Sequence, residues 1–255
     1  MKNRPVRPRG ARPGRRAVVV AGGYAAPVLV VSRRAALAYR IVWTLVTVLA
    51  VGRVCGLLTG SWSPGAFNYF TVQSNVLVLV WAAAQTVRTA VDLRRDGPRG
   101  ASTVSARGTG YVTMAILTTM IVYCVLLAPT AFTMGGAGGV FALTNLLVHV
   151  VVPLLAIGDY LLFGPKGTFR VLDPPRWALV PYAYLVFAFV RAEVGGPLPG
   201  GGQYPYPFMD VDALGWGTVV VNLVIITVAL EAVAFALFWA DRALGQRARG
   251  VLAAP

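Results

Sequence analysis

The sequence predicts an all-α protein, a polytopic membrane bundle of six transmembrane helices. Composition is the first observation: 57% of the 255 residues are hydrophobic and 13% are charged, whereas a typical soluble domain has about 25% charged residues. The second is that six runs are long and apolar enough to cross the hydrocarbon core, which takes roughly 20 residues. The third is that Lys and Arg gather in alternate connections between these runs.

The six runs follow one another closely and are expected to form one domain over residues 35–241. The fifth run is the shortest, and its Pro181 lies near the start, where a proline costs a helix least. The sixth is the longest and can tilt in the membrane. The expected spans are residues 36–59, 67–91, 109–129, 140–162, 176–194 and 214–240.

The two ends of the chain are expected to be basic tails. Residues 1–34 are rich in Arg, Pro and Gly, and most of this segment has no means of forming a core, which predicts disorder. Residues 242–255 carry three further arginines. With six spans, both tails lie on the same side of the membrane.

The positions of the basic residues indicate which side that is. All but two of the 23 Lys and Arg residues, Arg53 and Arg191, lie in the tails, in the connections on the tail side or at the span ends that face it. Lys and Arg are enriched on the cytoplasmic side of membrane proteins, so both termini are expected in the cytoplasm, with the protein in the plasma membrane. The net charge of +14 then reflects topology and attraction to anionic membrane lipids, and no nucleic-acid partner is needed to explain it.

The second span opens with an unusually polar stretch, FNYFTVQSN at residues 67–75. A membrane helix satisfies its own backbone hydrogen bonds. Polar side chains at this depth therefore either join helices or belong to a site. The stretch contains Asn68, Thr71, Gln73, Ser74 and Asn75.

The chain's only histidine, His149, lies in the fourth span four residues after Asn145. Thr71 and Asn75 have the same spacing, so each pair occupies one helix face. Both faces are expected in the outer half of the membrane, where they can meet. A threonine hydroxyl needs an adjacent base to act as a nucleophile, and imidazole is the usual base near neutral pH.

In that arrangement Asn75 or Asn145 would orient the imidazole or donate to a developing oxyanion. The alternative is that the same side chains serve only as hydrogen bonds between helices. The distance between the Thr71 hydroxyl and the His149 imidazole decides between them: about 3 Å or slightly more supports catalysis, and more than about 8 Å removes its basis.

The sequence also suggests roles for four charged residues in or near the spans. Arg53 and Arg191 are candidates for binding a carboxylate or phosphate of a substrate. Glu231 is expected to pair with a neighbour such as Arg40, a proton path being the alternative, and Asp159 is expected to reach the membrane interface.

No metal or cofactor is predicted, because one histidine and two cysteines in apolar runs give no ligand spacing. Asp210 and Asp212, just before the sixth span, are expected to cap that helix, since no third metal ligand is near. The aromatic residues in the preceding connection, Tyr204, Tyr206 and Phe208, suit the belt of aromatic side chains at a membrane surface.

Three motifs, FTVQSN, TNLLVHVVVP and YPYPFMDVD, are similar to those of small actinobacterial membrane proteins. Tyr69-Phe70-Thr71 in span two and Asn145 with His149 in span four also resemble the androgen-induced and androgen-dependent transmembrane proteins. Those are multipass threonine hydrolases that cleave fatty acid esters of hydroxy fatty acids. The resemblance covers residues 36–240 and implies Thr71 as nucleophile, His149 as base and a lipid ester as substrate.

Two features depart from the animal pattern: the polar Gln73-Ser74-Asn75 and the long YPYPFMDVD connection. Three functions stay open at this stage. They are a lipid-ester hydrolase, a non-enzymatic lipid-binding, small-molecule-binding or structural membrane protein, and a transporter. A transporter would need Arg53, Glu231 or His149 along a water path, and the sequence shows neither repeats nor broken helices of that kind.

Overall fold

The computed structural model describes residues 28–129, 139, 141–198 and 201–253. Over these residues the chain is helical, with six helices long and apolar enough to cross a membrane. The prediction of an all-α chain with six such helices is confirmed. They are Arg33–Val54, Phe70–Asp96, Ala106–Leu127, Leu143–Phe163, Asp173–Val194 and Val211–Arg247.

Several spans are divided where the backbone changes its hydrogen-bond register. The third and fourth each contain a π-helical segment, and the fifth begins with a separate short helix. In chain order the elements are α1 (Arg33–Val54), η1 (Pro64–Asn68), α2 (Phe70–Asp96), α3 (Ala106–Val122), π-helix η2 (Tyr123–Leu127), α5 (Leu143–Leu146), π-helix η4 (Leu147–Val151), α6 (Val152–Phe163), α7 (Asp173–Trp177), α8 (Leu179–Val194), η5 (Pro207–Met209) and α9 (Val211–Ala253).

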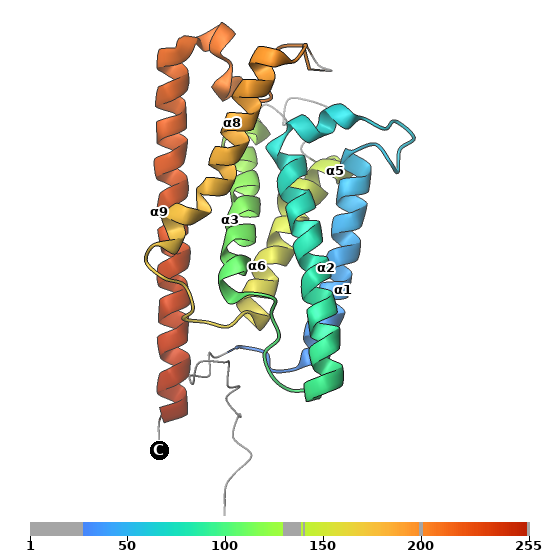
Figure 1. Ribbon diagram of the computed structural model, residues 1–255, viewed down its shortest axis with the longest axis vertical. Coiled ribbons are helices and arrows are strands. Elements are labelled where there is room, and N and C mark those ends of the chain that lie inside the picture. Colours follow the sequence, from blue (N-terminus) through green and yellow to red (C-terminus); the bar gives the residue numbers. More distant parts are fainter. Residues whose placement is uncertain (1–27, 130–138, 140, 199–200, 254–255) are drawn as a thin grey trace, which may run out of the picture.

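The helices run between two ends of an elongated bundle (Figure 1). We call the end where α1 begins and α9 finishes the termini end; η1, α5 and η5 lie at the far end. Helices α1, α2, α3 and α6 pack around a shared apolar core. Its centre is formed by Trp43, Val78, Ile116, Val148 and Val152.

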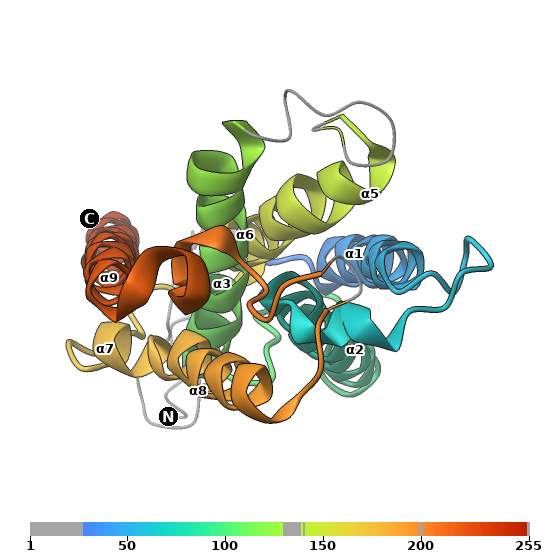
Figure 2. The same ribbon diagram turned by 90° about the horizontal axis from the view of Figure 1, so that it is seen from above.

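Helix α9 is attached to this body less closely. Its close backbone approaches are to α7 near the termini end and to η5 at the far end. Figure 2 shows α9 and α1 on opposite sides of the molecule. The far-end start of α9 is capped by Asp210, whose carboxylate accepts a hydrogen bond of 3.0 Å from the Ala213 N–H.

The arrangement of α1 and α9 corrects the expected pairing of Glu231 with Arg40. Arg40 is fully buried and binds Asp159 of α6, with Nε 2.6 Å from Oδ1 and Nη2 3.2 Å from Oδ2. Asp159 is therefore buried in the body and not at the membrane interface. Because α1 packs on α6, Glu231 on the opposite side is left out of the pair.

The first connection explains why the first two spans are shorter at the far end than expected. Helix α1 ends at Val54, because Gly56 adopts φ +78° and a Cβ there would lie 2.0 Å from the Ser61 carbonyl oxygen. Only glycine tolerates this turn. Tyr69 is extended, at ψ 136°, so α2 begins at Phe70 and the expected start at residue 67 is wrong.

The boundaries of the two expected tails also differ. The N–H of Ala35 donates to the Ser32 hydroxyl, which caps the start of α1, and the Val30 N–H donates to the Leu162 carbonyl at 2.9 Å. Residues 28–34 thus pack on the bundle, while residues 1–27 of the expected tail lie outside the described part. At the other end α9 continues to Ala253, so most of the expected second tail extends the sixth spanning helix.

Candidate functional site

Thr71 occupies the second position of α2, at the far end of the bundle. Its hydroxyl oxygen lies 3.3 Å from Nε2 of His149. The two residues are 78 positions apart in the sequence, and the fold brings their side chains into contact. This separation is the one expected for a nucleophile and its base.

His149 is held in place by an irregular turn of the fourth span. It lies in the π-helix η4, where the Val152 N–H bonds to the Leu147 carbonyl five residues earlier. In this register the Val148 carbonyl faces position 153, which is a proline without an N–H. One carbonyl in the middle of the bundle therefore lacks its helical donor.

Asn75 supplies the missing donor. Its Nδ2 lies 3.1 Å from the Val148 carbonyl oxygen and 2.7 Å from the Thr71 carbonyl oxygen. One amide group thus fastens the first turns of α2 to the turn that carries His149. Asn75 positions both members of the pair and is not itself bonded to the imidazole.

The hydrogen bonds of His149 assign its tautomer. Nδ1 lies 3.2 Å from the backbone carbonyl oxygen of Asn145. Because a carbonyl oxygen only accepts, Nδ1 carries the proton of the neutral ring and Nε2 presents a lone pair to the Thr71 hydroxyl. The backbone of Asn145 orients the imidazole, whereas its side-chain amide donates to the Gly139 carbonyl at 3.0 Å.

Two tyrosines that the sequence analysis did not assign to the site complete it. Tyr123, in the π-helix η2, stacks on the imidazole with ring centroids 3.8 Å apart and planes 9° apart. Tyr206 is buried, and its hydroxyl oxygen accepts a hydrogen bond of 3.4 Å from the Thr71 N–H. The YPYPF motif was the available signal for Tyr206, and placing this residue in a surface belt is wrong.

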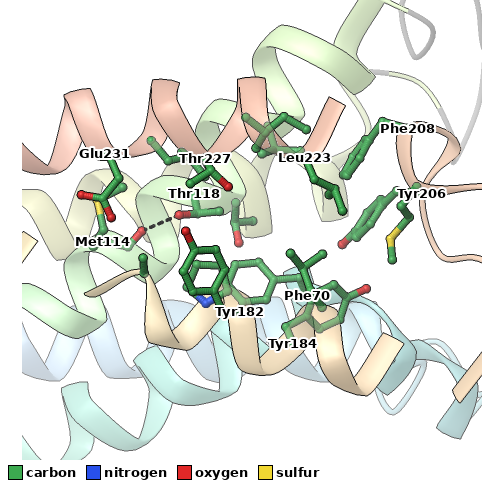
Figure 3. A pocket seen from close by; sticks show the side chains of 18 of the residues that line it. Phe70, Met114, Thr118, Tyr182, Tyr184, Tyr206, Phe208, Leu223, Thr227 and Glu231 are labelled. Carbon is green, nitrogen blue, oxygen red and sulfur yellow. Dashed lines mark hydrogen bonds between the residues drawn. The ribbon is translucent and has the colours of Figure 1, made fainter. Parts of the chain in front are cut away.

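Two cavities meet at this site. The first, the dyad cavity, lies at the far end and is lined by His149, Ser63, Tyr69 and Pro207 among others. The second, the α9 cavity, lies between α3, α8 and α9 (Figure 3). Both have mostly apolar walls, and the residues they share are Thr71, Tyr123, Leu127 and Tyr206.

The cavities differ in width. The cavity volume that is wide enough for water is about 420 Å³ in the dyad cavity and about 80 Å³ in the α9 cavity. The α9 cavity is therefore a narrow slot, whereas the dyad cavity has room for a bulkier group. Thr71 lies on the wall between them, so its hydroxyl is placed where a molecule occupying both would pass.

The two arginines proposed from the sequence lie elsewhere. Arg53 donates from Nε to the Thr144 hydroxyl at 3.3 Å, which ties α1 to α5. Arg191 donates to the Gln203 carbonyl at 3.2 Å, which fastens the chain before η5 to the end of α8. Neither is bonded to Thr71 or His149. Arg53 is next to Val54, which lines the dyad cavity. Arg191 stabilises the connection before η5 through its bond to the Gln203 carbonyl.

Within the described residues, no three His, Cys, Asp or Glu side chains are grouped to hold a metal ion. Comparison of the chain with protein-family models, curated proteins and solved structures finds no match. The geometry around Thr71 and His149 therefore carries the functional inference.

The role of Asn75 predicts a specific dependence on Pro153. Replacing Asn75 with Leu should cost about 1–3 kcal/mol of unfolding free energy, because the buried Val148 carbonyl loses its donor. In a Pro153→Ala background the restored N–H can bond to that carbonyl, so the same replacement should cost clearly less. Reversible unfolding in detergent of the four proteins in this double-mutant cycle measures the difference.

Gln73→Leu is the matched control, since the half-buried Gln73 donates to the Phe67 carbonyl in a solvent-exposed hydrogen bond. Its cost should be smaller than that of Asn75→Leu and independent of Pro153. Equal costs for Asn75→Leu with and without Pro153 would contradict the assignment of Asn75 as a replacement donor.

Proposed function

We propose that this protein is an integral membrane hydrolase that cleaves a lipid ester, with Thr71 as nucleophile and His149 as general base. The observation that carries the proposal is the 3.3 Å contact between the Thr71 hydroxyl and Nε2 of His149, whose other nitrogen is bonded to the Asn145 carbonyl. A backbone carbonyl takes the orienting place that a carboxylate has in a Ser-His-Asp triad.

The reaction follows from this geometry. His149 Nε2 takes the hydroxyl proton as Thr71 Oγ1 bonds to the ester carbonyl carbon. When the C–O bond to the leaving group breaks, the imidazolium returns that proton to the departing alcohol. A water molecule, deprotonated by His149, then attacks the acyl-threonine, which releases the acid and restores the Thr71 hydroxyl.

The start of α2 suits the negative charge that develops on the carbonyl oxygen. Thr71 is within the first turn, so its N–H has no partner inside the helix, and the helix start favours an anion. The Tyr206 hydroxyl accepts from this N–H and still carries a proton that it can donate. Burial raises the pKa of Tyr206, so that hydroxyl stays protonated at neutral pH and serves as the second donor.

The walls of the two cavities support a lipid as substrate. The α9 cavity is apolar along most of its length and narrow enough for a single chain, and the dyad cavity accepts the rest of the molecule. An ester with its carbonyl at Thr71 would then lie across the shared wall. The resemblance to the androgen-induced and androgen-dependent transmembrane hydrolases favours the same substrate class.

We place the site in the outer half of the plasma membrane, with both termini in the cytoplasm. Basic residues support this orientation, because Arg33, Arg94, Lys166 and Arg242 all belong to the termini end and such residues favour the cytoplasmic side. Substrate would then reach the dyad from the outer leaflet.

The rival function is non-enzymatic: a lipid-binding, small-molecule-binding or structural membrane protein in which these polar side chains join helices. It is favoured by the neighbouring bond between the hydroxyls of Ser74 and Thr119, 2.7 Å apart, which joins α2 to α3 and has no evident chemical role. The Thr71–His149 contact would then be one more hydrogen bond between helices.

Labelling with a fluorophosphonate probe separates the two functions. The wild-type protein in detergent or vesicles should be labelled and should hydrolyse long-chain esters, because Thr71 is activated by His149. Thr71→Ala should lose both properties, and mass spectrometry should find the probe on Thr71.

Thr118→Ala is the matched control, because that hydroxyl lines the α9 cavity but donates to its own helix at the Met114 carbonyl. It should retain labelling. Equal labelling of wild type and Thr71→Ala would refute the hydrolase and leave the non-enzymatic alternative.

Tyr206→Phe tests the second donor. If its hydroxyl stabilises the oxyanion, kcat should fall by about a hundredfold or more, the effect of removing one such donor, while KM changes little. Tyr204→Phe in the same connection removes a hydroxyl that does not contact Thr71 and should leave kcat near the wild-type value. A kcat unchanged by Tyr206→Phe would remove this residue from the mechanism.

A further inference from the structure

The α9 cavity exists because α9 is packed at two places and not between them. At the far end Val219 and Leu223 join the cluster around Tyr184 and Met209. Toward the termini end Ala234 and Phe238 join the cluster around Trp177, Phe169 and Tyr160. The stretch of α9 between these clusters faces α3 and α8 across the slot (Figure 3).

The far end of the slot and its termini end have different chemistry. Tyr206 and Phe208 lie at the far end, and Glu231 lies at the opposite end with Thr227 one helical turn away (Figure 3). The Tyr206 hydroxyl contacts Thr71. Leu223 and Glu231 are eight residues apart on α9, which corresponds to about 12 Å along the slot. A chain that enters beside Thr71 would pass Leu223 and then meet Glu231.

Glu231 has no hydrogen bond or ion pair in the part of the chain that the structure describes. Arg40, the cation expected to pair with it, is fully engaged by Asp159. A carboxyl group within a membrane-spanning helix is costly to keep without a partner. The Thr227 and Tyr182 hydroxyls also line the slot without a hydrogen bond in the described residues, so the unpartnered polar groups gather at one end of an apolar cavity.

We propose that the α9 cavity binds an alkyl chain that carries a hydrogen-bond donor, a hydroxyl or an amine, and that Glu231 accepts this bond. Both carboxyl oxygens of an ionised Glu231 accept, and a protonated carboxyl keeps one acceptor oxygen. The donor therefore finds a partner in either protonation state. A chain ending in a carboxylate is disfavoured, because it would face an ionised Glu231 with like charge.

The slot also offers such a ligand a way in from the lipid. Tyr182 of α8 lines the cavity and is 40% exposed. Between the two packed clusters of α9 the cavity is only partly enclosed, so it can be reached from the surface beside Tyr182. The ligand is thus an amphiphile of the bilayer, and its binding does not depend on any turnover at Thr71.

Binding of three matched amphiphiles to the full-length protein in detergent tests the proposal. The probes are hexadecanol, hexadecylamine and hexadecyl methyl ether, which share one chain and differ in the donor; none contains an ester. Dissociation constants come from displacement of a fluorescent lipid. At least one donor-bearing probe should bind about tenfold more tightly than the ether, the factor that one hydrogen bond to a charged group supplies.

Glu231→Leu should abolish this difference, and Glu231→Gln should retain part of it, because an amide oxygen still accepts. Glu193→Gln, an exposed change on α8, is the control and should bind as wild type. Thermal unfolding of each variant verifies that it is folded. Tighter binding of the amine assigns an ammonium ligand, and tighter binding of the alcohol assigns a hydroxyl.

Equal affinity for all three probes in the wild-type protein would overturn the proposal. A preference that persists in folded Glu231→Leu would do the same. Since none of the probes can be hydrolysed, these outcomes are independent of the Thr71 labelling result, and either proposal can fail without the other.

Discussion

The site depends on one backbone carbonyl that its own helix leaves without a donor. In a membrane, buried backbone groups must be satisfied within the protein. The π-helical register of η4 and the proline at position 153 leave the Val148 carbonyl open, and Asn75 reaches across from α2 to close it. The same amide holds the Thr71 carbonyl. The need of the buried Val148 carbonyl for a hydrogen-bond donor thus fixes the relative position of Thr71 and His149.

The helix start adds a second constraint that acts on the same residue. Thr71 combines a hydroxyl that faces His149 with an N–H that has no partner within α2 and is taken by the Tyr206 hydroxyl. A hydrogen bond that only joined helices would gain little from being at a helix start. A nucleophile gains an electropositive backbone where charge develops. The coincidence of the two features is what favours chemistry over helix packing.

The two cavities beside Thr71 indicate the shape of the ligand. A narrow slot and a wider pocket share the wall on which Thr71 lies, so a long molecule can present its middle to the dyad. The slot ends at Glu231, a carboxyl that the close-packed part of the bundle does not use. The unpacked stretch of α9 between its two packed clusters is the part that we propose binds a ligand.

The six spanning helices could be predicted from the sequence, because an apolar run of about 20 residues rarely forms anything other than a membrane-spanning helix. Sequence reasoning also identified Thr71 and His149, because polar residues four apart mark a helix face. It did not assign Tyr206 or Tyr123 to the site. The YPYPF motif drew attention to Tyr206 but does not show that its connection folds inward, and nothing near Tyr123 shows that two π-helical turns stack their rings. The pairing of Arg40 with Asp159 in place of Glu231 depended on which helices are neighbours, and hydropathy carries no such information.

The central claim is that neutral His149 keeps its proton on Nδ1 and accepts the Thr71 hydroxyl at Nε2. Because His149 is the only histidine, nitrogen-15 labelling of histidine gives the imidazole NMR spectrum of this ring, apart from any purification tag, which must be removed. The expected spectrum has a protonated Nδ1 and an unprotonated, hydrogen-bonded Nε2 whose resonance shifts when Thr71 is replaced with Ala. A proton on Nε2 of the neutral ring, with no response to Thr71→Ala, would contradict it.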